Sequence, residues 1–236
     1  MPREVKIVDI GGDHRYAAGW AYGLADVWPD GIAGRTRVAN PGCFPAATLT
    51  ALAPLLAEKL IEPGNIVVDA KTGISGAGRG GGGTFGYAES NENLVPYGLL
   101  KHTHMPEIAS TIERLSGGSA GGLVFTPHLV PMTRGVLATI YCRGGATTAR
   151  CLNAARRFYE GRAFVRVTDK PPQTKWATGS NLAFVSYAAD PERSLVIAMG
   201  VVDNLGKGAA GQALQNANLM CGLPETAGLD GMPVWP

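Results

Sequence analysis

The order of strand-like and helix-like segments is the feature that most constrains the fold of this chain. Strand patterns occupy residues 5–10, 37–39, 65–70, 123–130, 135–142, 164–167, 182–187 and 194–199. Helix patterns occupy residues 45–60, 106–115, 148–159 and 208–220. Strands outnumber helices and often follow one another directly, which predicts an α+β fold with helices on one face of a sheet. We expect 123–130 and 135–142 to pair as antiparallel neighbours, because only a short turn separates them.

Composition narrows the class of protein. The chain of 236 residues is 45% hydrophobic and 17% charged, which is typical of a globular protein rather than a disordered one. Its formal net charge of +2 argues against a nucleic-acid partner or a polybasic membrane-binding surface. We expect no membrane partner either, because no apolar run approaches the ~18 residues of a spanning helix. The four cysteines lack C-x-x-C spacing, which disfavours a zinc site or a disulfide framework and fits a reducing cytoplasm.

One cysteine, Cys43, lies in an unusual local sequence, Asn-Pro-Gly-Cys-Phe-Pro. Pro45 suits the first turn of a helix, because its missing N–H would be unpaired there. This places Cys43 at or just before the helix N-cap, facing free backbone N–H groups and the positive end of the helix dipole. Such surroundings lower the pKa of a thiol from about 8.5 toward neutrality. We therefore interpret Cys43 as a thiolate nucleophile, and Cys142, Cys151 and Cys221 as structural.

A nucleophilic thiol needs an acid–base partner, and the chain has only four histidines. Two of them, His102 and His104, lie in the run Lys-His-Thr-His-Met-Pro-Glu, just ahead of an expected helix. One of the two can act as the proton donor, with Glu107 orienting it. The run does not decide which imidazole faces the sulfur, and it also fits two solvated histidines at a helix entrance. A metal site is disfavoured because no third ligand has suitable spacing.

Two glycine-rich junctions are candidates for ligand contact. Ser75 and Gly76 begin the loop Ser-Gly-Ala-Gly-Arg, where glycine lets the backbone approach a ligand closely. Asn204 opens a strand-to-helix junction rich in glycine and alanine, whose N–H groups can hold an anion or an amide. The alternatives are a flexible loop at the first junction and a tight helix contact at the second.

Five long motifs together resemble the N-acetyl-γ-glutamyl-phosphate reductase family. They are NPGCFPAATL, VVDAKTGISGAGRG, YAESNENLVPYGLLKHTHMPEI, TPHLVPMTRGVLATIY and VVDNLGKGAAGQALQNANLMCGLPE. The matches are in the family's order and run nearly from end to end. The family belongs with the aspartate-semialdehyde and glyceraldehyde-phosphate dehydrogenases. The resemblance therefore implies the tail end of a Rossmann domain and an α+β catalytic domain with a mixed, largely antiparallel sheet.

The resemblance also implies a reaction. The cysteine matching Cys43 attacks N-acetyl-L-glutamyl 5-phosphate, expels phosphate and becomes a thioester, which NADPH reduces to N-acetyl-L-glutamate 5-semialdehyde in arginine biosynthesis. A thioester accepts hydride more readily than a carboxylate, so covalent catalysis divides one hard reduction into two easier steps. His104 is the first choice for the acid–base residue, with His102 and Glu107 as close candidates.

Ligand contacts and partners follow from the same resemblance. Arg134 is expected to clamp a substrate carboxylate or phosphate, with an exposed surface arginine as the alternative, and Asn40 is the second substrate-binding candidate. Ser75, Gly76 and Asn204 are expected on the nicotinamide side of NADP(H). The expected partners are a small acyl phosphate and further copies of the chain, in a dimer or tetramer.

One departure from the family concerns the first strand. The family carries a G-x-x-G-x-x-G loop for the pyrophosphate in its N-terminal part, and no such loop follows residues 5–10. We expect residues 1–40 to be the remnant of a Rossmann domain, 41–203 to form the catalytic and dimerisation domain, and 204–236 to return to the Rossmann side. The missing part, roughly a hundred residues, is expected to reflect a fragment or a misplaced start, with a natural variant as the alternative.

Other functions stay open on the sequence alone. A reductase of carrier-bound aminoadipyl phosphate, in lysine biosynthesis, would use the same chemistry, and no motif labels the residues that recognise the acyl group. Aspartate-semialdehyde dehydrogenase is a more distant option. A non-catalytic remnant is compatible with the missing loop, although the retention of Cys43, His102 and His104 argues against it.

Overall fold

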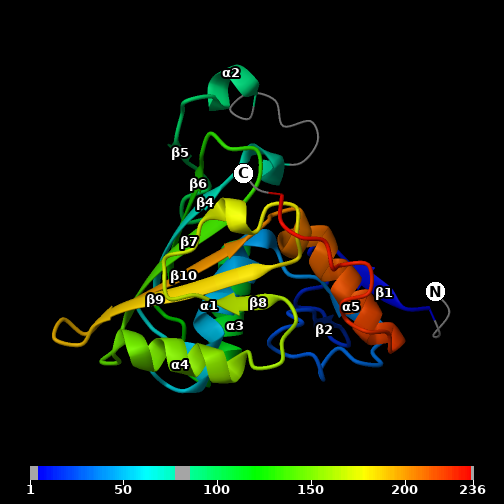
Figure 1. Cartoon of the computed structure of the whole chain (residues 1–236), viewed down its shortest axis with the longest axis horizontal. Coiled ribbons are helices and arrows are strands. Elements are labelled where there is room, and N and C mark those ends of the chain that lie inside the picture. The colour runs from blue at the N-terminus through cyan, green and yellow to red at the C-terminus, as the bar shows by residue number, and fades with distance from the viewer. Residues whose placement is uncertain (1–4, 78–85, 235–236) are drawn as a thin grey trace.

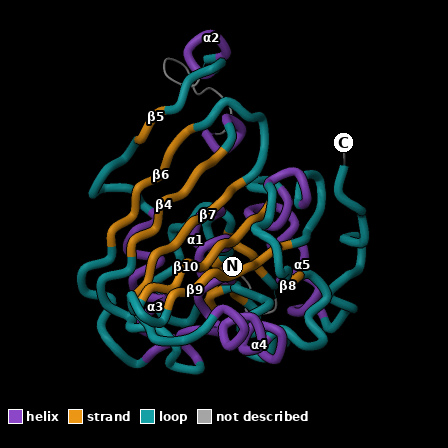
Figure 2. Tube along the Cα trace, turned by 60° about the vertical axis from the view of Figure 1, so that its left-hand side comes forward, coloured by secondary structure: helices purple, strands orange, loops and turns teal. Residues whose placement is uncertain are grey.

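The centre of the computed structural model, which describes residues 5–77 and 86–234, is a seven-stranded sheet (Figure 1). Its strands lie in the order β5 (Val95–Pro96), β6 (Val124–Leu129), β4 (Val67–Thr72), β7 (Val136–Arg143), β10 (Leu195–Val202), β9 (Ala183–Asp190) and β8 (Val165–Val167). Figure 2 shows these strands side by side. The β4–β6 and β8–β9 pairs are parallel and the other neighbours are antiparallel. The mixed, largely antiparallel sheet is confirmed.

Helices cover one face of this sheet. They are α1 (Cys43–Ala57), α3 (His104–Ser116) and α4 (Thr148–Phe158). Helix α1 packs on β7, β9 and β10, while α3 and α4 flank α1. Side chains along β4 and β7 alternate between buried and more exposed positions, as in a sheet with one packed face. Helix α1 is buried almost all round, as a central helix must be, and the α+β arrangement is confirmed.

A small parallel sheet lies beside the main body, against the last helix (Figure 1). It contains β1 (Ile7–Asp9), β3 (Arg37–Ala39) and β2 (Ala21–Tyr22) in that order. Helix α5 (Gly211–Cys221) packs on β1, and the side-chain amides of Gln212 and Asn216 each donate to the carbonyl oxygen of Gly23 at 2.9 Å. The N-terminal and C-terminal parts of the chain therefore lie together, while the domain boundaries at 40 and 203 stay a prediction.

Four short helical elements complete the described fold. They are the 3-10 helices η1 (Ile74–Ala77) and η3 (Thr174–Trp176), the single turn α2 (Tyr87–Ser90) and the π-helical turn η4 (Gly206–Ala210). Figure 1 shows α2 and β5 projecting from the main body. The turn η4 connects β10 to α5 and lies near the start of α1.

The expected hairpin of residues 123–130 and 135–142 is wrong. These segments form β6 and β7, and β4 lies between them, parallel to β6 and antiparallel to β7. The backbone of the connection bonds instead to the chain that follows β4: Ile74 N–H donates to Met132 O at 2.9 Å, and Ser75 N–H to Thr133 O at 3.1 Å. A short connection can therefore step over the intervening strand, and it meets the end of β4 beside η1.

The contact between α1 and β10 depends on Gly200. A Cβ atom at this position would overlap the carbonyl oxygen of Ala47 in α1. We expect Gly200→Ala to lower the free energy of unfolding by about 1–3 kcal/mol, the usual cost of overpacking a core, as measured by urea unfolding. The matched control is Gly145→Ala, because a Cβ there meets nothing within 4 Å. Equal stability of the two variants would contradict this close packing.

Candidate active site

The candidate site is built around Cys43, the first residue of α1. Gly42 is the N-cap and brings no side chain to the helix start, so the first backbone N–H groups stay available to the site. Cys43 borders two hollows of about 240 and 320 Å³. The smaller hollow, called here the histidine hollow, is also lined by Phe44, Tyr97, His102 and His104. The larger one, called here the glycine hollow, is also lined by Arg15, Ser75, Gly76, Asn204 and Gly208.

The protonation state of Cys43 differs from the sequence expectation. Burial raises the pKa of this thiol from an ordinary 9.0 to about 11. The backbone N–H groups of Phe44 and Cys43 lower the pKa, as a helix start should, but they do not outweigh the loss of solvent. The prediction of a thiolate at neutral pH is therefore wrong for the ligand-free fold, and the thiol needs a base to release its proton.

His104, the first residue of α3, lies where such a base is needed. Its ring packs against Gly42, since a Cβ atom on that glycine would overlap the imidazole. Burial, together with the charges of His102 and Arg15, lowers the pKa of His104 to about 3. His104 is therefore neutral at pH 7, and a neutral imidazole can accept a proton from a thiol.

His102 lies beside His104 and lines the same hollow. Its ring makes edge contacts with Phe44 and Phe125, at centroid distances of 5.7 and 5.2 Å. Its Nδ1 accepts the backbone N–H of His104 at 3.1 Å, so this imidazole helps to hold the start of α3. Burial lowers the pKa of His102 as well. The structure thus brings both predicted histidines to the cysteine, and gives His102 an additional structural contact.

Glu107 has a different role from the one expected. Its Oε1 accepts from the Tyr22 hydroxyl at 2.7 Å and from Gly42 N–H at 3.0 Å, and its Oε2 pairs with Arg15 at 2.7 Å. In the described part of the chain none of its hydrogen bonds goes to an imidazole. The prediction that Glu107 orients a histidine is therefore wrong. This carboxylate, 1% exposed, instead fixes the residue that precedes the nucleophile.

The two substrate-binding candidates lie in different surroundings. Asn40 is fully buried. Its Nδ2 donates to Ala209 O at 3.1 Å, and its Oδ1 accepts from Asn216 at 2.9 Å. Its amide is thus engaged inside the protein, and a role of Asn40 in substrate binding stays a prediction. Arg134 is 39% exposed and pairs at 3.3 Å with buried Asp203, which leaves part of its guanidinium open.

The three cofactor candidates come together in the glycine hollow. Asn204 Nδ2 donates to Ser75 Oγ at 2.9 Å, and Asn204 Oδ1 accepts from Gly135 N–H at 2.7 Å. Gly76 lines the hollow beside them. Gly78 and Arg79 of the same expected loop lie outside the described residues. Because this hollow adjoins Cys43 and offers an amide and a hydroxyl, it can receive a flat group that carries a carboxamide.

Sequence reasoning missed Arg15, a cation in the wall of the glycine hollow. Its Nε donates to Asn40 O at 3.0 Å while its Nη1 pairs with Glu107. Its positive charge lowers the pKa of both Cys43 and His104, although it is not the largest influence on either. No motif marks Arg15, because it lies in an irregular stretch of the sequence. The only sequence signal for its role is that a long, cationic side chain follows shortly after the first strand.

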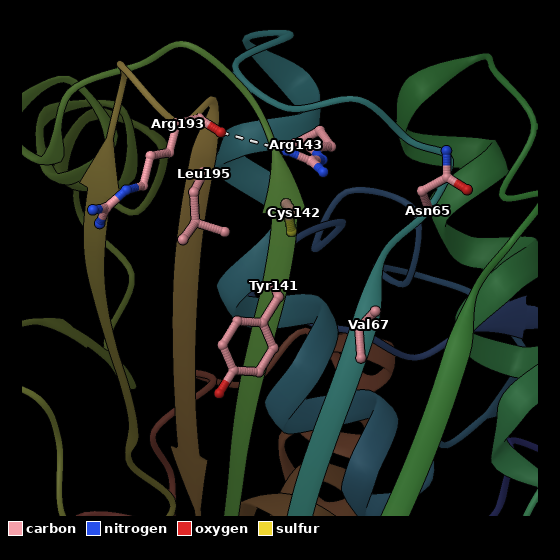
Figure 3. Close-up of a pocket in the computed structure, with 7 residues that line it drawn as sticks. All are labelled: Asn65, Val67, Tyr141, Cys142, Arg143, Arg193 and Leu195. Carbon is pink, nitrogen blue, oxygen red and sulfur yellow. Dashed lines mark hydrogen bonds between the residues drawn. The ribbon is translucent and has the colours of Figure 1, made fainter.

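A larger hollow, of about 420 Å³, lies elsewhere, on the sheet face opposite α1 (Figure 3). Val67, Tyr141 and Leu195 form its floor, and Arg143 donates to the carbonyl oxygen of Arg193 at its rim at 3.4 Å. It contains no histidine and no carboxylate among its lining residues. Size alone therefore does not identify the reactive site, and the chemistry points to the hollows at Cys43.

Metal-ligand clusters and membrane-spanning helices are both absent from the described ranges. Residues 5–77 and 86–234 contain no group of three or more His, Cys, Asp or Glu side chains arranged to hold a metal ion. Within the same ranges no helix has the length and apolar character needed to cross a membrane.

Comparison with known proteins gives matches along the whole chain. The family model "Semialdehyde dehydrogenase, dimerisation domain" matches residues 43–204. The chain is 85% identical to an N-acetyl-gamma-glutamyl-phosphate reductase of Bradyrhizobium sp. (strain ORS 278), over 100% of the chain and 73% of that protein. It is 42% identical to the protein of that name from Desulforudis audaxviator (strain MP104C), over 97% of the chain and 72% of the relative. Its fold is similar to aspartate semialdehyde dehydrogenase II from Vibrio cholerae, with a TM-score of 0.73 at 21% identity, over 91% of this chain and 72% of that one.

The pKa of Cys43 gives a test of the ligand-free site. Only the thiolate reacts with iodoacetamide, so alkylation of Cys43 should rise with pH toward a midpoint of about 11. Labelling at a series of pH values, read by mass spectrometry of the peptide, measures the profile. Cys43→Ser supplies the background from exposed Cys221. A midpoint near neutrality would show that the helix start outweighs burial after all.

Proposed function

We infer that this chain, which belongs to the N-acetyl-γ-glutamyl-phosphate reductase family, reduces N-acetyl-L-glutamyl 5-phosphate to N-acetyl-L-glutamate 5-semialdehyde in arginine biosynthesis. The observation that carries this inference is the placement of Cys43 at the start of α1, with neutral His104 packed on the preceding residue. Members of the family use a nicotinamide cofactor, and NADP(H) is the form that we propose.

The first half of the reaction uses the thiol and the imidazole. His104 accepts the thiol proton, and the sulfur of Cys43 attacks the acyl carbon of the substrate. The bond from this carbon to the phosphate oxygen breaks, phosphate leaves, and a thioester remains on Cys43. Arg15, a cation at the wall of the glycine hollow, provides charge to attract the phosphate group. The free N–H groups of α1 favour the negative charge that develops at the sulfur and the carbonyl oxygen.

The glycine hollow fits the nicotinamide end of the cofactor. Gly76 and Gly208 line it without side chains that would fill it. Asn204 and Ser75 supply polar groups for a carboxamide. When bound, NADPH supplies the hydride that reduces the thioester carbonyl. Protonated His104 then gives its proton to the carbonyl oxygen, and takes it back when the thiohemiacetal on Cys43 collapses. That collapse releases the semialdehyde and returns the sulfur for another turnover.

Arg134 is proposed as the anchor for the carboxylate of the substrate. It is partly exposed, and the buried carboxylate of Asp203 holds one of its nitrogens at 3.3 Å. Asp203 is itself fixed, because it also accepts Gly179 N–H at 2.6 Å and Leu205 N–H at 2.8 Å. An arginine anchored in this way can present its remaining N–H groups to a carboxylate.

Quaternary structure and location complete the proposal. The match to a dimerisation domain indicates an oligomer, and we propose a homodimer or homotetramer. A cytoplasmic location is proposed from the biosynthetic role and from the scattered cysteines. Residues 1–40 and 204–236 are proposed to belong with the cofactor-binding side, and 41–203 with the catalytic side.

The reaction and its nucleophile can be tested together. With NADPH, the protein should reduce N-acetylglutamyl phosphate in preference to aspartyl phosphate or carrier-bound aminoadipyl phosphate, measured by NADPH absorbance. Cys43→Ser should abolish turnover, because the pKa of a serine hydroxyl is far too high for the same assistance, while circular dichroism shows an intact fold. Full activity in this variant would remove Cys43 from the mechanism. Preference for another acyl phosphate would reassign the substrate.

The acid–base role separates the two histidines. His104→Asn should lower kcat by about 10²–10⁴-fold, the usual contribution of a general acid–base group, with a much smaller change in KM. His102→Asn is the matched control, since it removes the neighbouring imidazole of the same hollow. A larger loss of kcat in His102→Asn than in His104→Asn would exchange the two roles.

A further inference from the structure

One buried lysine takes no part in the reaction as described. Lys207 is 1% exposed and lies in the π-helical turn η4. Its ammonium group forms an ion pair with Asp26, which is also 1% exposed. Removing such a pair from water costs several kcal/mol per ion, so a buried ion pair is weak evidence for stability alone. The pair therefore calls for another explanation.

The ion pair belongs to a network that joins distant segments. Lys207 Nζ donates to Gln215 Oε1 at 2.5 Å, and Asn181 Nδ2 donates to the same oxygen at 3.3 Å. Gln215 Nε2 in turn donates to Asp26 Oδ1 at 3.3 Å and to Glu225 Oε2 at 2.8 Å. These contacts tie η4 to the N-terminal part of the chain, to α5 and to the segment before β9.

The residue after Lys207 supports the nucleophile. A Cβ atom on Gly208 would lie 2.8 Å from Cβ of Cys43 and 3.1 Å from the carbonyl oxygen of Asp203. The next residue, Ala209, accepts a hydrogen bond from buried Asn40 at 3.1 Å. The backbone of η4 is thus in direct contact with the nucleophile and with the chain that leads to it. A small shift of this turn would move the sulfur or open a gap beside it.

The composition of η4 explains why an anchor is needed. The turn reads Gly-Lys-Gly-Ala-Ala, so Lys207 has its only long side chain. Glycine and alanine allow the close approach to Cys43, but their side chains make no directional bonds that could define the position of the turn. π-helical turns are rare and occur often at functional sites. The directional bonds of the Lys207 ammonium group fix the turn where apolar packing could not.

We propose that Lys207 is a positioning residue for Cys43: its ion pair with Asp26 fixes η4, so that Gly208 supports the nucleophile from behind. This inference rests on the proposed role of Cys43. The Lys207 ammonium group also lies 5.3 Å from the centroid of the Phe164 ring, within the range of a cation–π interaction. The ammonium group of Lys207 thus has three partners: Asp26, Gln215 and the Phe164 ring.

Two variants of the 236-residue chain test the proposal. Asp26→Leu combined with Lys207→Met removes both charges, so that neither is left buried and unpaired. Asp26→Asn is the mild variant, because it keeps the size of the side chain and an oxygen acceptor. A displaced nucleophile can lose about 10²-fold in rate, so we expect kcat to fall about 10–100-fold in the double variant. KM for the acyl phosphate and the affinity for NADPH should change little.

A second measurement needs no substrate. The rate of Cys43 alkylation by iodoacetamide at a fixed pH should change in both variants, because the surroundings of the sulfur change. Tyr187→Phe is the matched control: it removes a buried hydrogen bond of 2.9 Å to Ala51 O, in α1 but away from η4. It should lower the melting temperature and leave kcat and alkylation unchanged.

The outcomes separate this proposal from the proposed function. Wild-type kcat and wild-type alkylation in whichever variant folds, as judged by circular dichroism, would show that the pair is only structural and overturn the proposal. A matching loss in Tyr187→Phe would overturn it too, because any loss of stability would then suffice. Activity that survives complete alkylation of Cys43 would instead reject the proposed function, whatever Lys207 does.

Discussion

The hydrogen bond from Gly42 N–H to the buried carboxylate of Glu107 is the contact on which the site depends most. It joins the residue before the nucleophile to α3, the helix that also begins with His104. One helix therefore holds the base and fixes the loop that carries the thiol. Burial raises the pKa of Glu107, while the charge of Arg15 and the hydrogen bonds from Tyr22 and Gly42 lower it. The carboxylate is thus held by the partners that it organises.

The electrostatics of the site follow from its burial. Loss of solvent disfavours both charged forms, so the pKa of Cys43 is raised to about 11 and that of His104 is lowered to about 3. The resting pair is a neutral thiol beside a neutral imidazole. Ionisation of the pair therefore needs a negative charge beside His104, which an anionic substrate would supply. A thiol kept neutral between turnovers is also less open to oxidation, which acts on the thiolate.

Local sequence predicted the parts of the site whose chemistry is local. The Pro-Gly-Cys-Phe-Pro run marks the start of α1, and the two histidines mark the start of α3. What the sequence could not reveal depends on contacts across long stretches of chain. Glu107 meets Gly42 across 65 positions, and Asn40 meets Asn216 across 176.

The pKa of Cys43 also escaped prediction, because the helix start is visible in the sequence while the burial that opposes it is not. The prediction that β6 and β7 form a hairpin failed for the same reason. A short connection predicts a hairpin unless a third strand, here β4, is known to lie between the two.

Cys43 is thus held on two sides by groups of hydrogen-bonded polar side chains. On one side Glu107, Arg15 and Tyr22 fix Gly42 before it, and on the other the Asp26–Lys207 pair fixes Gly208 against it. Both sets contain a cation paired with a buried carboxylate, and in both the contact with the cysteine itself is made through glycine backbone. Glycine lets the backbone come close to Cys43 but does not fix its position there. The position is fixed instead by charged side chains one residue or one helix away. A sulfur that must attack one carbon atom in a defined geometry benefits from having the backbone on both sides of it fixed in this way.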